Sequence, residues 1–122
     1  PGFLPEEDLL KMFRVVDVAV FPSLYEPFGI VALEGMVAGL PVVVSDAGGL
    51  NEIVEDRVNG MKFPTGNPDL LADAIVTLLL DGDLRARITE TAHRMIMEKY
   101  LWKHIAEQTV KTYETAMGAD KA

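Results

Sequence analysis

Apolar positions follow two different spacings along the chain, and their order predicts alternating helices and strands. Residues 16–22 (VDVAVFP), 41–46 (PVVVSD) and 61–64 (MKFP) are short apolar runs without a clean polar alternation, which is typical of strands covered on both faces. Residues 5–15 and 29–40 carry apolar side chains three and four positions apart, which indicates helices. The first half of the chain is therefore expected to run helix, strand, helix, strand.

End signals support these two helices. Pro5 suits the first helical position and is followed by acidic residues, while Gly39 and Pro41 end the second helix. The side chains expected to face the core are Leu9, Leu10, Met12, Phe13 and Val16 in the first helix, and Ile30, Leu33, Val37 and Leu40 in the second.

The second half of the chain is predicted to be mainly helical. Residues 47–56 form a Gly-rich turn that enters a short helix, residues 59–60 (NG) predict a turn before the third strand, and residues 67–69 (NPD) start the next helix. Two more helices cover about 84–98 and 101–117. Their expected core residues are Leu70, Leu71, Ala74, Ile75, Leu78 and Leu79, then Ile88, Ala92 and Met95, then Trp102, Ile105, Ala106, Thr109, Val110, Tyr113 and Met117.

This order of elements predicts the fold class. Strands that alternate with helices imply right-handed crossovers and a parallel sheet, so we expect an α/β fold with a Rossmann-like parallel sheet flanked by helices and followed by C-terminal helices. A doubly wound domain has about twice as many strands, and its ligand crevice lies where its two halves meet. We therefore interpret residues 1–122 as one partial domain, the second half of such a sheet.

Composition narrows the choice of partners. The 122 residues carry a formal net charge of −8, which argues against nucleic acid, whose phosphates are bound by clustered Lys and Arg. The absence of Cys favours a reducing compartment, so we expect a cytoplasmic location, and the apolar runs are too short to span a membrane. His93 and His104 have no Cys or second His at metal-binding spacing, so no metal site is expected. An acidic chain that binds phosphate needs a local source of positive potential.

The stretch PSLYEPFGIVALEGMVAG offers that source. It follows the first strand, where open α/β sheets bind ligands, and Gly29 opens the next helix. Free amides of Gly29, Ile30 and Val31 would bind a diphosphate, because a helix N-terminus carries roughly half a positive charge. Glu34 lies about 7–8 Å further along the helix axis, where it could accept hydrogen bonds from a ribose, and Glu26 would lie on the other side of the phosphates.

The same residues allow plainer interpretations. Two Glu residues eight positions apart arise often by chance, Glu26 could be an acid that stabilises a helix start, and Glu34 could be a solvated position. Gly48 and Gly49 could shape a ligand loop or simply make a strand-to-helix turn.

The longer string PSLYEPFGIVALEGMVAGLPVVVSDAGGLNEI resembles the donor-site segment of retaining GT-B glycosyltransferases, the family of glycogen and sucrose synthases and of bacterial group 1 glycosyltransferases. The family's Glu, seven residues, Glu motif matches Glu26 and Glu34, and the motif after the first Glu matches residues 28–30 (FGI). The Gly-Gly pair at 48–49 and the Trp-bearing C-terminal helix match as well. The likeness therefore covers nearly the whole chain.

This resemblance implies a role for the chain as the nucleotide-sugar-binding part of a C-terminal domain. The parent enzyme would move a hexose from a nucleotide diphosphate sugar to a glycan or small acceptor, with retention of the anomeric configuration and without a metal or other cofactor. Glu26 would be the catalytic residue, in contact with the transferred hexose. The substrate-binding residues that the resemblance implies are Phe28, Gly29, Ile30, Val31 and Glu34, the amides for the diphosphate and Glu34 for the ribose.

The family also uses an Arg and a Lys that would precede residue 1, together with an N-terminal acceptor-binding domain. The parent is therefore expected to be a transferase, while this chain alone is expected to be inactive and to self-associate through the strand edge at 16–21. Two alternatives stay open at this point: a non-catalytic nucleotide-binding or assembly domain of the same fold, and a GT-B-type epimerase.

Overall fold

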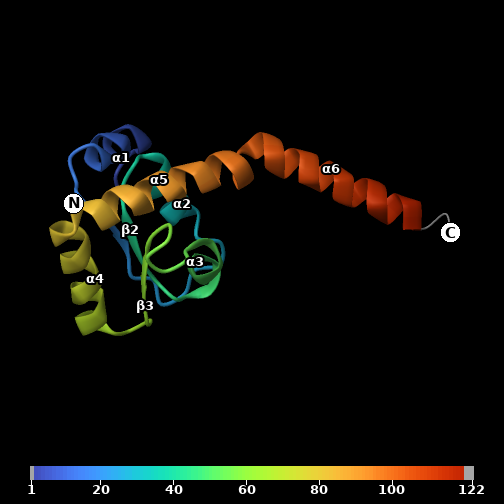
Figure 1. Cartoon of the computed structure of the whole chain (residues 1–122). Helices are drawn as coiled ribbons and strands as arrows, with labels where there is room; N and C mark the ends of the chain where they lie inside the picture. Colours follow the sequence, from blue (N-terminus) through green and yellow to red (C-terminus); the bar gives the residue numbers. More distant parts are fainter. Residues whose placement is uncertain (1, 120–122) are drawn as a thin grey trace.

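A three-stranded sheet lies at the centre of the fold in the computed structural model, which describes residues 2–119 (Figure 1). Strands β1 (Ala19–Phe21), β2 (Val42–Ser45) and β3 (Met61–Phe63) are hydrogen-bonded in the order β1-β2-β3, and both pairings are parallel. Val43 of β2 lies opposite Val20 of β1 and is also the register partner of the first residue of β3. The predicted parallel α/β sheet is confirmed.

Helices connect and cover the strands. Those within residues 2–119 are α1 (Glu6–Phe13), α2 (Ile30–Val37), α3 (Gly48–Ile53), α4 (Pro68–Leu80), α5 (Gly82–Lys99) and α6 (Trp102–Ala119). The Asn67 side chain caps α4 by accepting a hydrogen bond from the Leu70 amide at 3.0 Å. Asp81 caps α5 in the same way, so α5 begins at Gly82, slightly earlier than the sequence pattern predicted.

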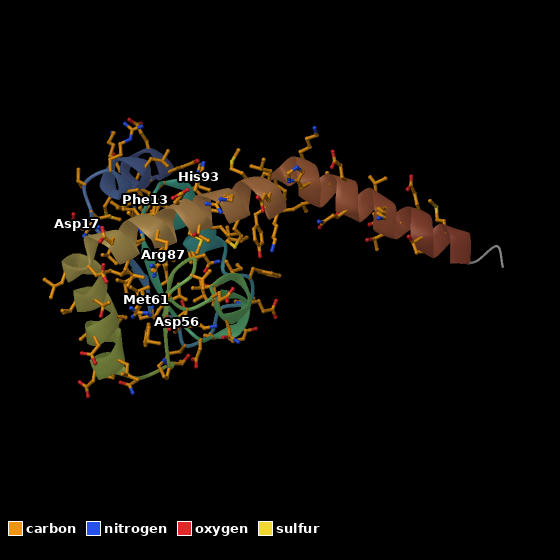
Figure 2. All side chains as sticks on the ribbon, viewed as in Figure 1. Phe13, Asp17, Asp56, Met61, Arg87 and His93 are labelled. Atoms are coloured by element: carbon orange, nitrogen blue, oxygen red, sulfur yellow. The ribbon has the colours of Figure 1, made fainter. Side chains whose placement is uncertain are left out.

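The two faces of the sheet carry separate cores because successive residues of β2 point to opposite sides. Val42 and Val44 face one cluster, which contains Phe13 of α1 and residues of α2, α3 and the C-terminal half of α5. Val43 faces the other, which contains Met61 of β3 and residues of α4 and the N-terminal half of α5. Phe13 and Met61 are labelled in Figure 2. Helix α5 thus contributes to both cores.

The face that α2 buries differs from the prediction. Ile30 and Val37, expected in the core, are 55% and 61% exposed, whereas Gly35 and Met36 are buried. A Cβ at Gly35 would lie 3.3 Å from Val42 Cγ1, so the glycine lets the helix approach the sheet closely. The helix is apolar on almost all sides, and apolar spacing alone therefore does not select its buried face.

Helix α6 extends away from the sheet (Figure 1). Its predicted core face is wrong for the residues that the structure describes, because Trp102 is 83% exposed and Tyr113 and Met117 are also exposed. Within residues 2–119, no helix combines the length and the apolar character needed to cross a bilayer.

Candidate functional site

The loop between β1 and α2 brings Glu26 to the tip of α2. Glu26 Oε1 accepts a hydrogen bond from the Gly29 amide at 3.1 Å and a longer one from the Phe28 amide at 3.5 Å. Gly29 is the N-cap of α2 with a φ of 75°, a left-handed conformation that favours glycine. A carboxylate is stabilised at this position because the first amides of a helix lack partners and the helix dipole is positive there. Glu26 therefore caps α2.

Capping by Glu26 changes the state of the three amides predicted to hold a diphosphate. The Gly29 amide is already engaged, whereas the amides of Ile30 and Val31 donate to no acceptor within residues 2–119. An anion at this helix tip has two open donors and must compete with the Glu26 carboxylate for the third. The tip of α2 thus provides a positive potential, but the Glu26 carboxylate already occupies one of its amides.

Glu34 lines an apolar groove of about 590 Å³ between α1, α2, α3 and the start of α6. Phe28 and Ile30 line the same groove, but Glu26, Gly29 and Val31 are not among its lining residues. The structure therefore brings Glu34 together with only two of the other predicted site residues. The lining residues are Glu6, Leu9, Leu10, Phe13, Pro27, Phe28, Ile30, Leu33, Glu34, Val37, Gly49, Glu52, Ile53, Ile96, Tyr100, Trp102 and Ile105.

The charge in the groove is entirely negative. Glu6, Glu34 and Glu52 line it, and no Lys or Arg is among its lining residues, all of which the structure describes. Carboxylates accept hydrogen bonds from hydroxyl groups but repel phosphate. The groove therefore suits groups that carry hydroxyls better than it suits phosphate, whereas the open amides at the tip of α2 suit an anion.

The exposure of the apolar site residues is high. Phe28 is 74% exposed and Val31 is 38% exposed, and Ile30 is more than half exposed. An exposed cluster of large apolar side chains beside a groove is typical of a binding surface. Gly29, in contrast, is buried against α3.

The end of β2 and the first turn of α3 contact the loop that carries Glu26. The Gly49 amide donates to the Glu26 carbonyl at 2.8 Å, and the Ser45 hydroxyl donates to the Ser23 carbonyl at 2.6 Å. Ser45 is only 1% exposed. The sequence patterns did not identify these contacts, because they join residues of two different crossovers and depend on how the strands pair.

The carboxyl end of β2 is also tied to the segment after β3. Asp46 Oδ1 accepts hydrogen bonds from the Thr65 hydroxyl at 2.5 Å and from the Thr65 amide at 2.8 Å. These two hydrogen bonds favour the charged carboxylate and lower the pKa of Asp46 below its ordinary value of 3.8. Within residues 2–119, no group of three His, Asp or Glu side chains is arranged to hold a metal ion.

Comparison with known protein families identifies the class of protein to which this fold and this helix tip belong. A family model described as "Glycosyl transferases group 1" matches residues 1–95, and the chain belongs to this family. Its fold is the Rossmann-like α/β fold of GT-B glycosyltransferases. The resemblance based on Glu26, Glu34 and the FGI motif is confirmed at the level of the family.

Individual relatives match most of this chain. An uncharacterized glycosyltransferase of Methanocaldococcus jannaschii is 47% identical over 116 residues, which are 95% of this chain and 30% of that protein. Sucrose-phosphate synthase of Thermosynechococcus elongatus superposes with a TM-score of 0.85 at 32% identity, over 98% of this chain and 30% of that one. HepE of Anabaena, solved in complex with UDP and with UDP-glucose, gives TM-scores of 0.81 and 0.79 at 32% identity, over 86% of this chain and 29% of that one. The chain thus spans about 30% of the length of these relatives.

Proposed function

We propose that the chain is the donor-binding part of a retaining glycosyltransferase that moves a hexose from a nucleotide diphosphate sugar to a glycan or small acceptor. Membership of the glycosyltransferase family and the likeness to HepE, which is solved with UDP and UDP-glucose, support this function. One observation carries it: the tip of α2 offers open amides immediately beside a groove that Glu34 lines.

In the proposed complex, the diphosphate binds the amides of Gly29, Ile30 and Val31. Its charge displaces the Glu26 carboxylate, which caps the helix when no anion is bound. Loss of a helix cap costs about 0.5–2 kcal/mol, and the phosphate oxygens replace it at the same amides. Glu26 is then free to turn toward the hexose, and Glu34 accepts hydrogen bonds from the ribose.

The chemistry follows from this arrangement. Cleavage of the bond between the hexose and the diphosphate leaves positive charge near the anomeric carbon and negative charge on the leaving phosphate. Glu26 stabilises the positive charge near the anomeric carbon, and the dipole of α2 stabilises the negative charge on the leaving phosphate. The leaving phosphate takes the proton of an acceptor that attacks the same face of the sugar, so the configuration is retained. The proposed reaction needs no metal ion, because helix amides and cations elsewhere in the enzyme balance the phosphate charge.

The whole activity belongs to a longer protein in this proposal, because residues 1–122 correspond to about 30% of the matched relatives. The acceptor-binding domain and the cations that neutralise the diphosphate are assigned to that remainder. The groove contains only acidic charge, so the isolated chain should bind its donor weakly and should not catalyse transfer. A cytoplasmic location is part of the same proposal and is supported by the absence of Cys.

The test uses Glu26→Ala and Glu34→Ala in the full-length transferase. We expect Glu26→Ala to lower kcat about 10²–10³-fold, as removal of an electrostatic stabiliser does. Glu34→Ala should raise KM about tenfold or more, because it removes hydrogen bonds to a charged group. Glu98→Ala, an exposed change on α5, is the control. Near wild-type transfer by both variants would contradict the site assignment.

A second candidate is a non-catalytic nucleotide-binding or assembly domain of the same fold. The capping contact between Glu26 and the Gly29 amide favours it, because this contact gives the proposed catalytic residue a purely structural role. The two candidates differ in one measurement: the second predicts UDP binding without sugar transfer by the full-length protein, and the first predicts both.

A further inference from the structure

The first turn of α3 lies closer to the loop that carries Glu26 than any side chain would permit. A Cβ added at Gly49 would lie 2.5 Å from the carbonyl carbon of Phe28 and 2.6 Å from its oxygen, and one added at Gly48 would overlap the Glu26 carbonyl oxygen. Both neighbours are backbone atoms, which cannot rotate away as the end of a side chain can. The absence of side chains at these two positions is therefore a condition for the loop's present position.

Polar contacts fix the same loop from the same side. The Gly49 amide donates to the Glu26 carbonyl, and the buried Ser45 hydroxyl donates to the Ser23 carbonyl at the start of the loop. At the other end, Gly29 packs on α3, since a Cβ there would lie 2.9 Å from Ile53 Cδ1. The loop is thus supported at both ends and in the middle by the last residue of β2 and by α3.

We propose that Ser45, Gly48 and Gly49, here called the loop seat, are positioning residues that set the location of the Glu26 carboxylate and the Gly29 amide. The inference rests on the proposed function in one respect: the Glu26 carboxylate and the Gly29 amide are the groups that the proposed function assigns to donor binding. The loop seat touches neither donor nor acceptor in this proposal and acts through the backbone of the loop.

The size of the effect follows from van der Waals distances. Carbon atoms pack at about 3.5–4.0 Å, so a methyl group at Gly49 would push the Phe28 carbonyl away by about 1 Å. A displacement of about 1 Å at a catalytic constellation can cost roughly 10²-fold in rate. The same displacement would break the hydrogen bond between Gly29 and Glu26, which is 3.1 Å long.

Matched glycines in the same chain separate this effect from general backbone strain. Gly49 has no left-handed φ, so Gly49→Ala adds the clash alone. Its control is Gly82→Ala at the start of α5, because an added Cβ there would approach no atom within 4 Å beyond its own chain neighbours and helix backbone. Gly48 has a φ of +45°, so Gly48→Ala is compared with Gly66→Ala, whose φ is +80° and whose surroundings are open.

The experiment uses amide NMR spectra of the isotope-labelled chain and of these variants, first to follow hydrogen exchange of the Gly29 amide in heavy water and then to follow a UDP titration. In the wild-type chain, exchange of the Gly29 amide should be slowed by the hydrogen bond that it donates to Glu26. In Gly49→Ala this protection should be lost, and UDP-induced shifts should need at least tenfold more nucleotide. Gly82→Ala should behave like the wild type, while thermal unfolding shows that each variant is folded.

Two results would overturn the inference. A Gly49→Ala chain that keeps the wild-type protection of the Gly29 amide would show that the loop seat does not set the loop's position. If Gly49→Ala does not fold, Ser45→Ala decides, because it removes a tether without adding an atom; unchanged protection of the Gly29 amide in Ser45→Ala would then contradict the proposal. Failure of the wild-type chain to bind UDP would count against the proposed function, whereas hydrogen exchange judges the loop seat without any nucleotide.

Discussion

Glu26 caps a helix, and in the function proposed above it also serves a ligand. Its carboxylate accepts a hydrogen bond from the Gly29 amide, which is the same group that an anion would use. Because carboxylate and phosphate carry like charges, both cannot occupy the tip of α2. Donor binding and helix capping are therefore linked at this residue in the function proposed above.

Glu26→Gln tests this competition. The amide side chain can still accept the hydrogen bond but carries no charge, so the unfolding free energy should fall by about 0.3–1 kcal/mol, the usual contribution of a charge at a helix end. Affinity for UDP should rise about fivefold, because a like charge near the phosphates is worth about 1 kcal/mol in water. Urea unfolding and a UDP titration measure the two effects, with Glu98→Gln as the control. Weaker UDP binding by Glu26→Gln would contradict the competition.

Asp46 gives a prediction about pH. Its hydrogen bonds from Thr65 lower its pKa below 3.8 in the folded chain, so the unfolded chain binds more protons as the pH falls through this range. The stabilisation from these bonds is thus complete above the ordinary pKa and is lost as the pH falls through the lowered folded value. Thr65→Val, which removes the stronger contribution, should be less stable than the wild type near neutral pH.

The difference in stability between Thr65→Val and the wild type should shrink below pH 3.8. Urea unfolding at a series of pH values measures it. Thr77→Val is a matched control, because the Thr77 hydroxyl donates to a backbone carbonyl, which does not titrate in this range. If the difference in unfolding free energy between Thr65→Val and the wild type does not depend on pH, the proposed role of the Asp46 carboxylate is excluded.

At the scale of the element, the two faces of α2 serve different purposes. Met36 is fully buried against the sheet, whereas its neighbour Val37 is 61% exposed and lines the groove. Met36→Ala should therefore lower the unfolding free energy by about 2–5 kcal/mol, as large-to-small changes in cores do. Val37→Ala should change it by less than about 0.5 kcal/mol. Urea unfolding of the two variants compares them directly, and equal losses would show that the assigned faces are wrong.

The predicted elements were recovered where the local signals were strong. The Asn-Pro-Asp start of α4 and the β-branched run of β2 both act through nearest neighbours, so they can be identified without knowledge of the fold. The buried face of α2 could not be identified, because an apolar helix of eight residues presents apolar side chains on most sides. Its orientation is chosen by Gly35, which allows close approach to the sheet.

The candidate site was predictable only in part for a similar reason. Glu26, Gly29 and Glu34 lie in one short segment, and the sequence pattern correctly predicted that Gly29 starts the helix that carries Glu34. The support from Ser45 and Gly49 depends on the order of strands in the sheet, which local spacing does not contain. The capping contact of Glu26 agrees with one of the two interpretations that its position allowed, and its contact with a hexose stays a prediction.

At the scale of the whole molecule, β1 forms an edge. It pairs with β2 on one side, and within residues 2–119 no strand pairs with its other side. Edge strands with free backbone groups add to other chains unless they are covered or charged. β1 spans only Ala19–Phe21, which is shorter than the predicted strand and limits the strength of such pairing.

We therefore predict weak, concentration-dependent self-association of this chain through β1. Sedimentation velocity over a range of concentrations should show a rising average mass, and dilution should reverse it. The full-length parent is the comparison, since the interpretation of this chain as the second half of a larger sheet predicts that other residues of the parent cover this edge. A single monomeric species at every concentration would refute the prediction.

Trp102 gives the chain an intrinsic optical reporter. It is the only Trp in the sequence, it is 83% exposed at the start of α6, and it also lines the groove that contains Glu34. An indole already in water changes its emission little when the chain unfolds, so fluorescence would underestimate denaturation. The same indole should shift to shorter wavelengths when a ligand or a neighbouring domain covers it, which makes emission colour a label-free measure of occupancy.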